Sequence, residues 1–206
     1  MSVIAIREFI PHIGKEELAV SRITKASEIA TKHGAKSSLW KVSAGHGAGD
    51  YVMMNNYESF TKGAMAFEGF SKDPEMVNLN KERGTNPAAD LRGPNVFRMA
   101  YGAPSNPPRP VLVQRFYQMP RKHMTSVLAL APELDKLMQN QDVTIGVGVP
   151  IVAGDHEMMG VVYRFNSMEH WGKAVDAMVE DQEFAALVER ANELGTLKAS
   201  RMLLSI

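Results

Sequence analysis

Cysteine is absent from the 206-residue sequence, which excludes disulfides, thiolate nucleophiles, iron–sulfur clusters and cysteine-ligated zinc. Net charge is absent too. The 23 Lys and Arg balance 23 Asp and Glu, so the chain lacks the positive field that attracts nucleic acid or an anionic membrane. No stretch approaches the roughly 18 uncharged apolar residues of a membrane span. Arg7 and Glu8 follow only a few apolar residues, unlike the pattern of a secretory signal. We therefore expect a cytoplasmic protein with no nucleic-acid or membrane partner.

The composition that remains is that of a globular protein, with 45% hydrophobic and 22% charged residues. Methionine is abundant, at 14 residues. Six of the 11 prolines fall between positions 83 and 110, and residues 102–110 read as an extended linker because proline fixes φ and donates no hydrogen bond. The length allows two units of about 100 residues. We expect units at 1–101 and 111–206, joined by the linker.

The two units show the same order of elements. Alternating and helical apolar spacings, with Ser and Asp helix caps, predict β-α-β-β-α-α-β twice. In the first unit we expect strands at 3–9, 37–43, 51–55 and 95–101, and helices at 15–33 and from 59 and 73. In the second unit we expect strands at 111–117, 143–149, 157–165 and 197–206, and helices at 126–140, at 167–178 and from 181.

A constant offset of 108 residues supports an internal repeat. It aligns Arg7 with Arg115, the cap Ser59 with Ser167, and the cap Asp73 with Asp181. Each third strand also carries a methionine pair. We interpret the chain as a tandem duplication.

Such a unit folds as a four-stranded antiparallel sheet with helices on one face, and the second copy can cover the other face. The chain resembles the dimeric α/β-barrel superfamily at this point, in two fused copies. The resemblance rests on the element order and on the paired helices that begin Ser59-Phe60 or Ser167-Met168 and continue through Asp73-Pro74-Glu75 or Asp181-Gln182-Glu183. It is similar to NIPSNAP-like and antibiotic-biosynthesis-monooxygenase-like members in particular. The resemblance implies an α+β fold, two tandem ferredoxin-like units packed sheet to sheet as an intramolecular barrel.

Arginines are the first candidate ligand-binding groups. Strand order 4-1-3-2 in each unit is expected to bring Arg98 near Arg7 and Arg201 near Arg115, and arginine pairs can hold an anionic ligand by bidentate hydrogen bonds. The alternative is that these arginines bond structural carboxylates such as Glu8 or reach solvent.

Two hairpin histidines, His46 and His156, are candidate catalytic bases, because neutral imidazole can accept a proton from an activated carbon acid. The alternative is that each is an exposed turn residue. Asp155, His156 and Glu157 are consecutive and alternate in direction along a strand, so we expect no metal site.

Aromatic and methionine side chains near the third strands are compatible with a pocket for a flat ligand, and also with ordinary core packing. The candidates are Trp40, Met53 and Tyr163.

Three functional hypotheses remain open. The first is a protein that binds a small apolar or anionic molecule and oxidises or isomerises it without a cofactor, with an arginine stabilising the oxyanion and a histidine taking the proton. The second is a non-catalytic NIPSNAP-like binding module, and the third is a heme-binding or heme-degrading protein. Whether the chain is an enzyme stays open, as does a homo-oligomer formed through sheet edges.

Overall fold

The fold was analysed in a computed structural model that describes residues 2–104 and 108–206. Residues 105–107 of the expected linker lie outside the described residues. The first half contains β1 (Val3–Pro11), α1 (Glu16–Lys32), β2 (Lys36–Gly45), β3 (Tyr51–Tyr57), α2 (Phe60–Lys72), α3 (Pro74–Thr85) and β4 (Ala89–Tyr101).

The second half repeats this order after the linker, with one helix divided. It contains β5 (Val111–Gln118), the short helix η1 (Arg121–His123), α4 (Met124–Leu128), α5 (Ala131–Gln139), β6 (Thr144–Val152), β7 (Met158–Phe165), α6 (Met168–Glu180), α7 (Gln182–Leu194) and β8 (Thr196–Ser205).

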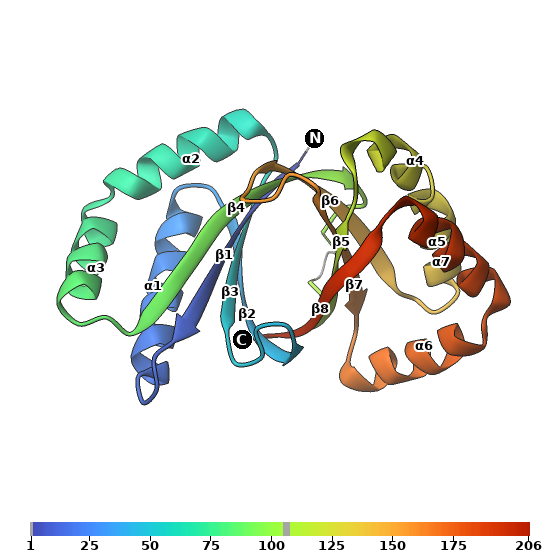
Figure 1. The fold of residues 1–206 in the computed structure, drawn as a ribbon. Helices are drawn as coiled ribbons and strands as arrows, with labels where there is room; N and C mark the ends of the chain where they lie inside the picture. Colours follow the sequence, from blue (N-terminus) through green and yellow to red (C-terminus); the bar gives the residue numbers. More distant parts are fainter. Residues whose placement is uncertain (1, 105–107) are drawn as a thin grey trace.

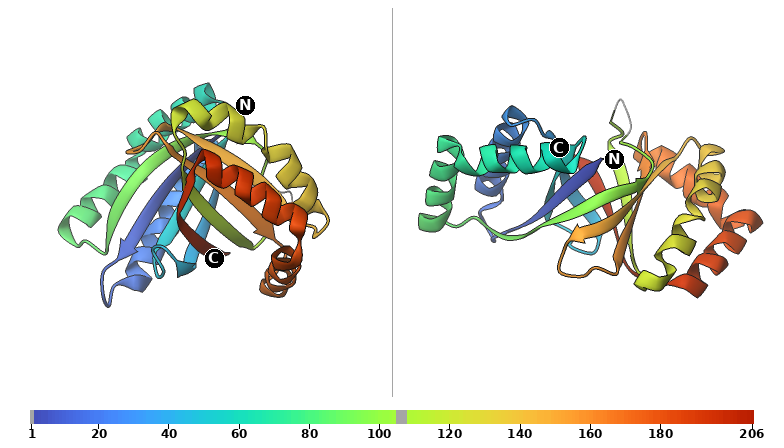
Figure 2. Two further views of the ribbon diagram at one scale, coloured as in Figure 1. Left: turned by 45° about the vertical axis from the view of Figure 1, so that its right-hand side comes forward. Right: turned by 90° about the horizontal axis from the view of Figure 1, so that it is seen from above.

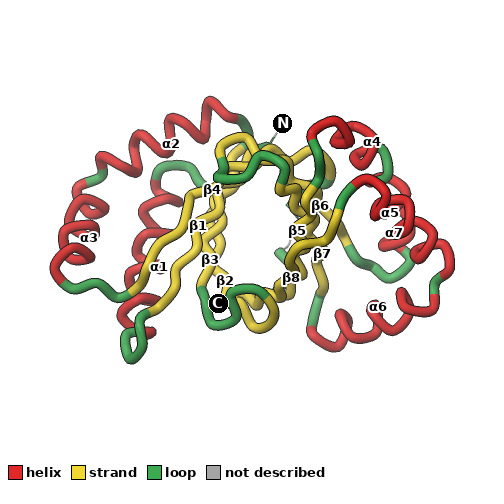
Figure 3. Tube along the Cα trace, in the orientation of Figure 1, coloured by secondary structure: helices red, strands yellow, loops and turns green. Residues whose placement is uncertain are grey.

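The eight strands form one closed barrel in the order β1-β3-β2-β8-β5-β7-β6-β4. Each half contributes four adjacent strands in the expected 4-1-3-2 arrangement, so the predicted α+β fold of two ferredoxin-like units is confirmed. The helices of the first half lie outside one side of the barrel and those of the second half outside the other (Figure 1). The same separation holds when the molecule is turned (Figure 2), and the strands form a single ring between the two helical layers (Figure 3).

Two seams join the halves, β2 to β8 and β4 to β6, both antiparallel. These seams pair the outer strands of both four-stranded sheets within the chain, so the sheet edges considered as a route to a homo-oligomer are already used in the described barrel.

A glycine allows close approach at each seam. Gly45 and Gly102 have φ values of +82° and +69°, and a Cβ on them would lie 2.3 Å from the Ser200 carbonyl oxygen and 2.2 Å from the Ile145 carbonyl oxygen, respectively. Only glycine accommodates both the left-handed backbone and this proximity.

The predicted helix caps are confirmed by hydrogen bonds. The hydroxyls of Ser59 and Ser167 accept from the backbone N–H three residues on, and the carboxylates of Asp73 and Asp181 accept from the N–H two residues on. These bonds satisfy N–H groups that a helix start leaves free.

Two elements differ from expectation by more than a few residues. The predicted helix 126–140 is divided into α4 and α5, because Pro132 occupies the first turn of α5, where a missing N–H costs nothing. Strand β4 begins at Ala89 rather than 95, so it runs through Pro94, one of the six prolines between positions 83 and 110.

Three apolar clusters fill the layers. One lies between the first-half sheet and its helices and includes Phe9, Ile23 and Leu79. Its second-half counterpart is larger and includes Tyr163, Phe165 and Met178. The third lies inside the barrel and consists of Trp40, Val42, Val52, Met54, Leu112 and Leu203.

Candidate functional site

The barrel interior contains a cavity of about 610 Å³, which we call the barrel cavity. Its lining comes from all the strands except β8. The linker residues Ala103, Pro104 and Pro108 complete the lining, and because their side chains are exposed the cavity reaches the surface there. The apolar part of its wall consists of Ile4, Ile6, Trp40, Met54, Phe97, Met99, Leu112, Phe116, Val161 and Val162.

Arg164 on β7 is the most unusual polar group of this wall. It is only 7% exposed, and its Nη1 is buried without a hydrogen-bond partner. In the described part of the chain no carboxylate forms an ion pair with it. Burial, together with the nearby charge of Arg109, lowers the pKa of Arg164 to about 10, so the guanidinium remains charged at neutral pH. A buried cation without a counter-ion is costly, and an anionic or hydrogen-bond-accepting ligand would offset that cost.

Glycine in the neighbouring strand makes room for this guanidinium. A Cβ on Gly146 would lie 2.7 Å from Nη2 of Arg164. Gly148 and Gly160 also line the cavity, where larger side chains would fill it. Arg164 was not among the site residues predicted from the sequence. The available signal was the presence of three glycines inside strands, because such glycines mark a close approach or an empty space.

Arg109 lies beside Arg164 at the cavity wall and is bound to protein groups. Its Nη2 donates to Oδ1 of Asp142 at 2.8 Å, and its Nη1 donates to the Arg164 carbonyl oxygen at 3.2 Å. Its charge is therefore compensated, whereas Arg164 is the buried cation of this wall without a counter-ion among the described residues; Lys36, which also lines the cavity, is exposed to solvent.

Arg201 forms a separate polar layer inside the barrel. Its Nε donates to Oε1 of Gln114 at 2.8 Å, its Nη1 donates to Glu8, and its guanidinium lies 5.2 Å from the Phe116 ring centre. Arg201 therefore pairs with the structural carboxylate of Glu8, which was the alternative to binding an anionic ligand.

The expected arginine pairs do not form. Arg98 lies opposite Val3 in the antiparallel β1–β4 register, which places it four residues along β1 from Arg7. Arg201 lies opposite Gln114, so it faces the barrel while its sequence neighbour Arg115 faces the helices. The prediction that Arg98 adjoins Arg7 and Arg201 adjoins Arg115 was wrong for these reasons.

Arg115 and Tyr163 contact each other on the helix side of the second sheet. The guanidinium of Arg115 lies 5.2 Å from the Tyr163 ring centre. Burial raises the pKa of the Tyr163 hydroxyl. Both side chains pack in a dense apolar layer and do not line the barrel cavity.

Of the aromatic and methionine candidates, Trp40 lines the barrel cavity and its Nε1 donates to Oγ of Ser38 at 2.9 Å. Met53 faces the first-half helices, and it is the adjacent Met54 that faces the cavity. Alternation along β3 places the two methionines on opposite faces.

His46 and His156 lie in exposed turns, after β2 and before β7. The backbone N–H of His46 donates to the Ser200 carbonyl oxygen at 2.9 Å. Neither imidazole is among the groups that line the barrel cavity.

Heme ligation was tested on the histidines that pack near helices. Both ring nitrogens of His170 are engaged, by the Asn166 N–H and the Gln141 carbonyl oxygen. Nε2 of His33 bonds Asp73 at 2.8 Å, and Lys15 donates to Asn86 and Pro87. These residues do not fit an axial heme ligand.

His123 does not line the barrel cavity. Residues 2–104 and 108–206 contain no group of three His, Asp or Glu side chains placed to hold a metal ion. No helix among them is long and apolar enough to cross a membrane.

Comparison with known proteins gives structural matches only. No protein-family model and no curated protein sequence matches the chain. An anthrone oxidase-like protein matches with a TM-score of 0.69 and 14% identity over 100% of this chain and 91% of that one. A Fusobacterium nucleatum protein provisionally described as a monooxygenase matches with a TM-score of 0.65 and 7% identity over 99% and 92%. A variant chlorite dismutase of Candidatus Nitrospira defluvii matches with a TM-score of 0.58 and 8% identity over 100% and 90%.

Identities this low establish the fold and nothing finer. The matches extend over nearly the whole of each chain, so both halves and their relative placement are shared. The chain therefore shares with these proteins the α+β fold of a closed eight-stranded barrel, and both barrel halves lie in one polypeptide.

Proposed function

We propose that the barrel cavity binds a small, flat, largely apolar molecule whose phenolic or enolic oxygen accepts a hydrogen bond from Arg164. The observation that carries this proposal is the volume of about 610 Å³ inside a closed barrel, within the range of about 300–1,000 Å³ of small-molecule sites.

The composition of the wall supports the proposal. Aromatic, aliphatic and thioether groups make most of the cavity surface, and Met54 and Met99 provide flexible contacts for a flat ligand. Arg164 supplies a fixed, charged donor at one place on this wall. A few convergent polar groups in an apolar cavity are what orient a ligand. The resemblance of the fold to an anthrone oxidase-like protein makes anthrone a suitable first probe.

Binding, rather than turnover, is the activity that we propose. Oxidation or isomerisation without a cofactor requires a base near the reacting carbon. The cavity lining in the described residues includes no histidine, so the geometry supports retention of the ligand more directly than proton transfer.

Trp40 provides the measurement because it is part of the cavity wall. The chain contains two tryptophans, and a Trp171→Phe variant leaves Trp40 as the single reporter. Titration with anthrone and with a neutral quinol should change Trp40 fluorescence saturably, and binding should raise the melting temperature.

Gly160→Leu is the variant that separates cavity binding from surface adsorption. A Cβ on Gly160 would have its nearest neighbour at 3.8 Å, in the Phe116 ring, so a leucine can enter the cavity without moving the backbone. Gly172→Leu makes the same change on α6, where no atom lies within 4 Å of the added Cβ. We expect Gly160→Leu to abolish the fluorescence change and Gly172→Leu to retain it. Equal binding by both variants, or no probe binding to the parent protein, would refute the proposal.

A further inference from the structure

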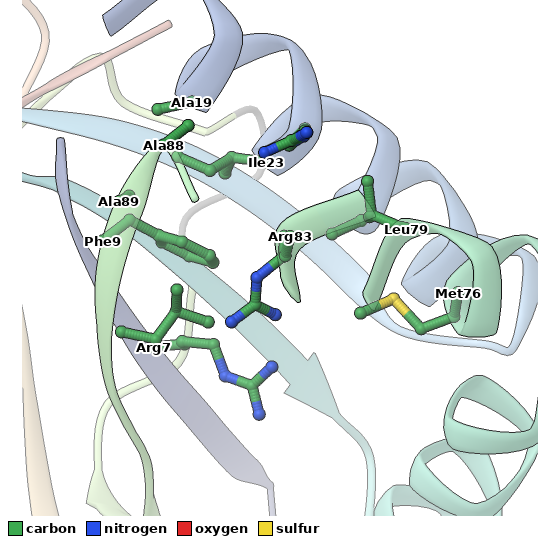
Figure 4. Close-up of a pocket in the computed structure, with 12 residues that line it drawn as sticks. Arg7, Phe9, Ala19, Ile23, Met76, Leu79, Arg83, Ala88 and Ala89 are labelled. Carbon is green, nitrogen blue, oxygen red and sulfur yellow. The ribbon is translucent and has the colours of Figure 1, made fainter. Parts of the chain in front are cut away.

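Three arginines converge on a second pocket, between the first-half sheet and its helices. Arg7 comes from β1, Arg22 from α1 and Arg83 from α3, and we call the space that they line with apolar neighbours the arginine pocket. Its volume is about 20 Å³. Figure 4 shows the guanidinium groups of Arg7 and Arg83 pointing into the same space, with the Phe9 ring beside them.

These three charges have no carboxylate partner among the described residues. Arg22 donates to the backbone oxygens of Asn86, at 2.6 Å, and Glu82, at 3.4 Å. Arg83 donates to the side-chain oxygen of Asn80 at 3.0 Å. The Nε atoms of Arg7 and Arg22 are buried without a partner.

The arginines also act on one another. Burial lowers the pKa of Arg7, and the charge of Arg83 lowers it further. Burial likewise lowers the pKa of Arg83, and the charge of Arg22 adds to the effect. Like charges in a partly dehydrated space repel, and an anion placed among them removes that repulsion.

The second half of the chain serves as an internal comparison. At the offset of 108, Arg7 corresponds to Arg115, but Arg22 and Arg83 correspond to Leu130 and Ala191. Arg115 is accompanied by tyrosines, including Tyr163 at 5.2 Å, in a layer packed with apolar side chains. The arginine cluster is therefore a feature of the first half alone and is not required by the fold.

We propose that the arginine pocket binds the carboxylate group of a small organic acid. Guanidinium forks match the planar carboxylate by bidentate hydrogen bonds. The volume of about 20 Å³ favours a small planar head group over a tetrahedral phosphate and leaves no room for a bulky tail. The inference does not depend on the barrel cavity, which lies on the other face of the sheet.

The test is a titration of the full chain with formate, acetate and propionate, by calorimetry at constant ionic strength, with chloride and phosphate as comparison anions. The carboxylates should bind, and Arg83→Met should weaken their binding about 10- to 100-fold, the usual effect of losing a hydrogen bond to a charged group. Arg121→Met, which removes an exposed arginine outside the pocket, should bind as the parent protein does.

Melting temperature gives a second readout. A structural arginine would destabilise the protein when removed, whereas Arg83→Met should keep or raise the melting temperature without ligand, because it relieves repulsion. Carboxylates should raise the melting temperature of the parent protein only. If Arg83→Met does not fold, Arg83→Lys serves instead, since it keeps the charge and loses the fork.

The outcomes are separable from those for the barrel cavity. Acetate binding should leave Trp40 fluorescence unchanged and should persist in Gly160→Leu. Unchanged carboxylate binding by the Arg83 variant, or no carboxylate binding to the parent protein, overturns the proposal. Equal binding of chloride and phosphate overturns the assignment to carboxylates.

Discussion

Replacing Gly102 by alanine tests how tightly the β4–β6 seam closes the barrel. The backbone of Gly102 has a φ of +69°, and an added Cβ would lie 2.2 Å from the Ile145 carbonyl oxygen. The left-handed conformation costs a residue with a Cβ about 1–2 kcal/mol. Relieving the overpacked contact by shifting a strand costs about 1–3 kcal/mol more. We therefore expect Gly102→Ala to lower the free energy of unfolding by about 2–5 kcal/mol.

Two other glycines separate these contributions in urea unfolding followed by circular dichroism. Gly14 has a φ of +74° with no atom within 4 Å of its added Cβ, so Gly14→Ala should show the backbone cost alone, about 1–2 kcal/mol. Gly84 in α3 has neither a positive φ nor a close neighbour, and Gly84→Ala should gain up to about 1 kcal/mol.

The difference between the Gly102 and Gly14 variants measures the seam itself. If Gly102→Ala loses no more stability than Gly14→Ala, then the contact with Ile145 is not tight and the reasoning about the seam is refuted. A change in the denaturant slope would instead indicate that the two halves no longer unfold together.

Three further outcomes are expected. Leu203 is fully buried in the barrel interior, so Leu203→Ala should lower the free energy of unfolding by about 2–5 kcal/mol in calorimetry; a smaller loss would mean that the interior can collapse around the gap. Hydrogen bonds from His33 and Lys32 lower the pKa of Asp73 below its usual 3.8, so its contribution to stability is present above about pH 4 and is lost as the pH falls further. The urea midpoint should therefore decline less steeply between pH 4.5 and 2.5 in Asp73→Asn than in the parent protein, and equal slopes would contradict the assignment. Asp181→Ala removes the cap of α7 and should cost about 1 kcal/mol, whereas Asp181→Asn should cost little.

The order of the elements could be predicted because each depends on local signals. Helix starts follow from side chains that bond the nearest free N–H groups, as at Ser59 and Asp181. Pro132 was the one ambiguous signal, because a proline can either begin a helix or disrupt the middle of one.

The faces of the strands could not be assigned in the same way. In β3, the residues from Tyr51 to Asn55 are all buried, because one face packs on helices and the other faces the barrel interior. A sheet covered on both faces shows no contrast between inner and outer residues. For this reason the methionine pair indicated a buried strand but not which methionine would reach the cavity.

The arginine pairs failed for a different reason, since the order of strands in a sheet does not reveal which residues of two neighbouring strands lie opposite each other. The antiparallel register of β1 and β4 places Arg98 opposite Val3, four residues from Arg7. Convergence of Arg7 with Arg22 and Arg83 joins residues far apart in the sequence, on a strand and two helices, which no local pattern indicates.

The two seams have a consequence for biosynthesis. Strands β2 and β4 of the first half find their outer neighbours only in β8 and β6, which the ribosome makes much later. Until then the nascent first half exposes two unpaired strand edges, and such edges recruit other chains. Nascent chains stalled after residue 110 should therefore depend on chaperones more than chains stalled after β8. The barrel cannot close, and its folding cannot be completed, until β8 has been synthesised.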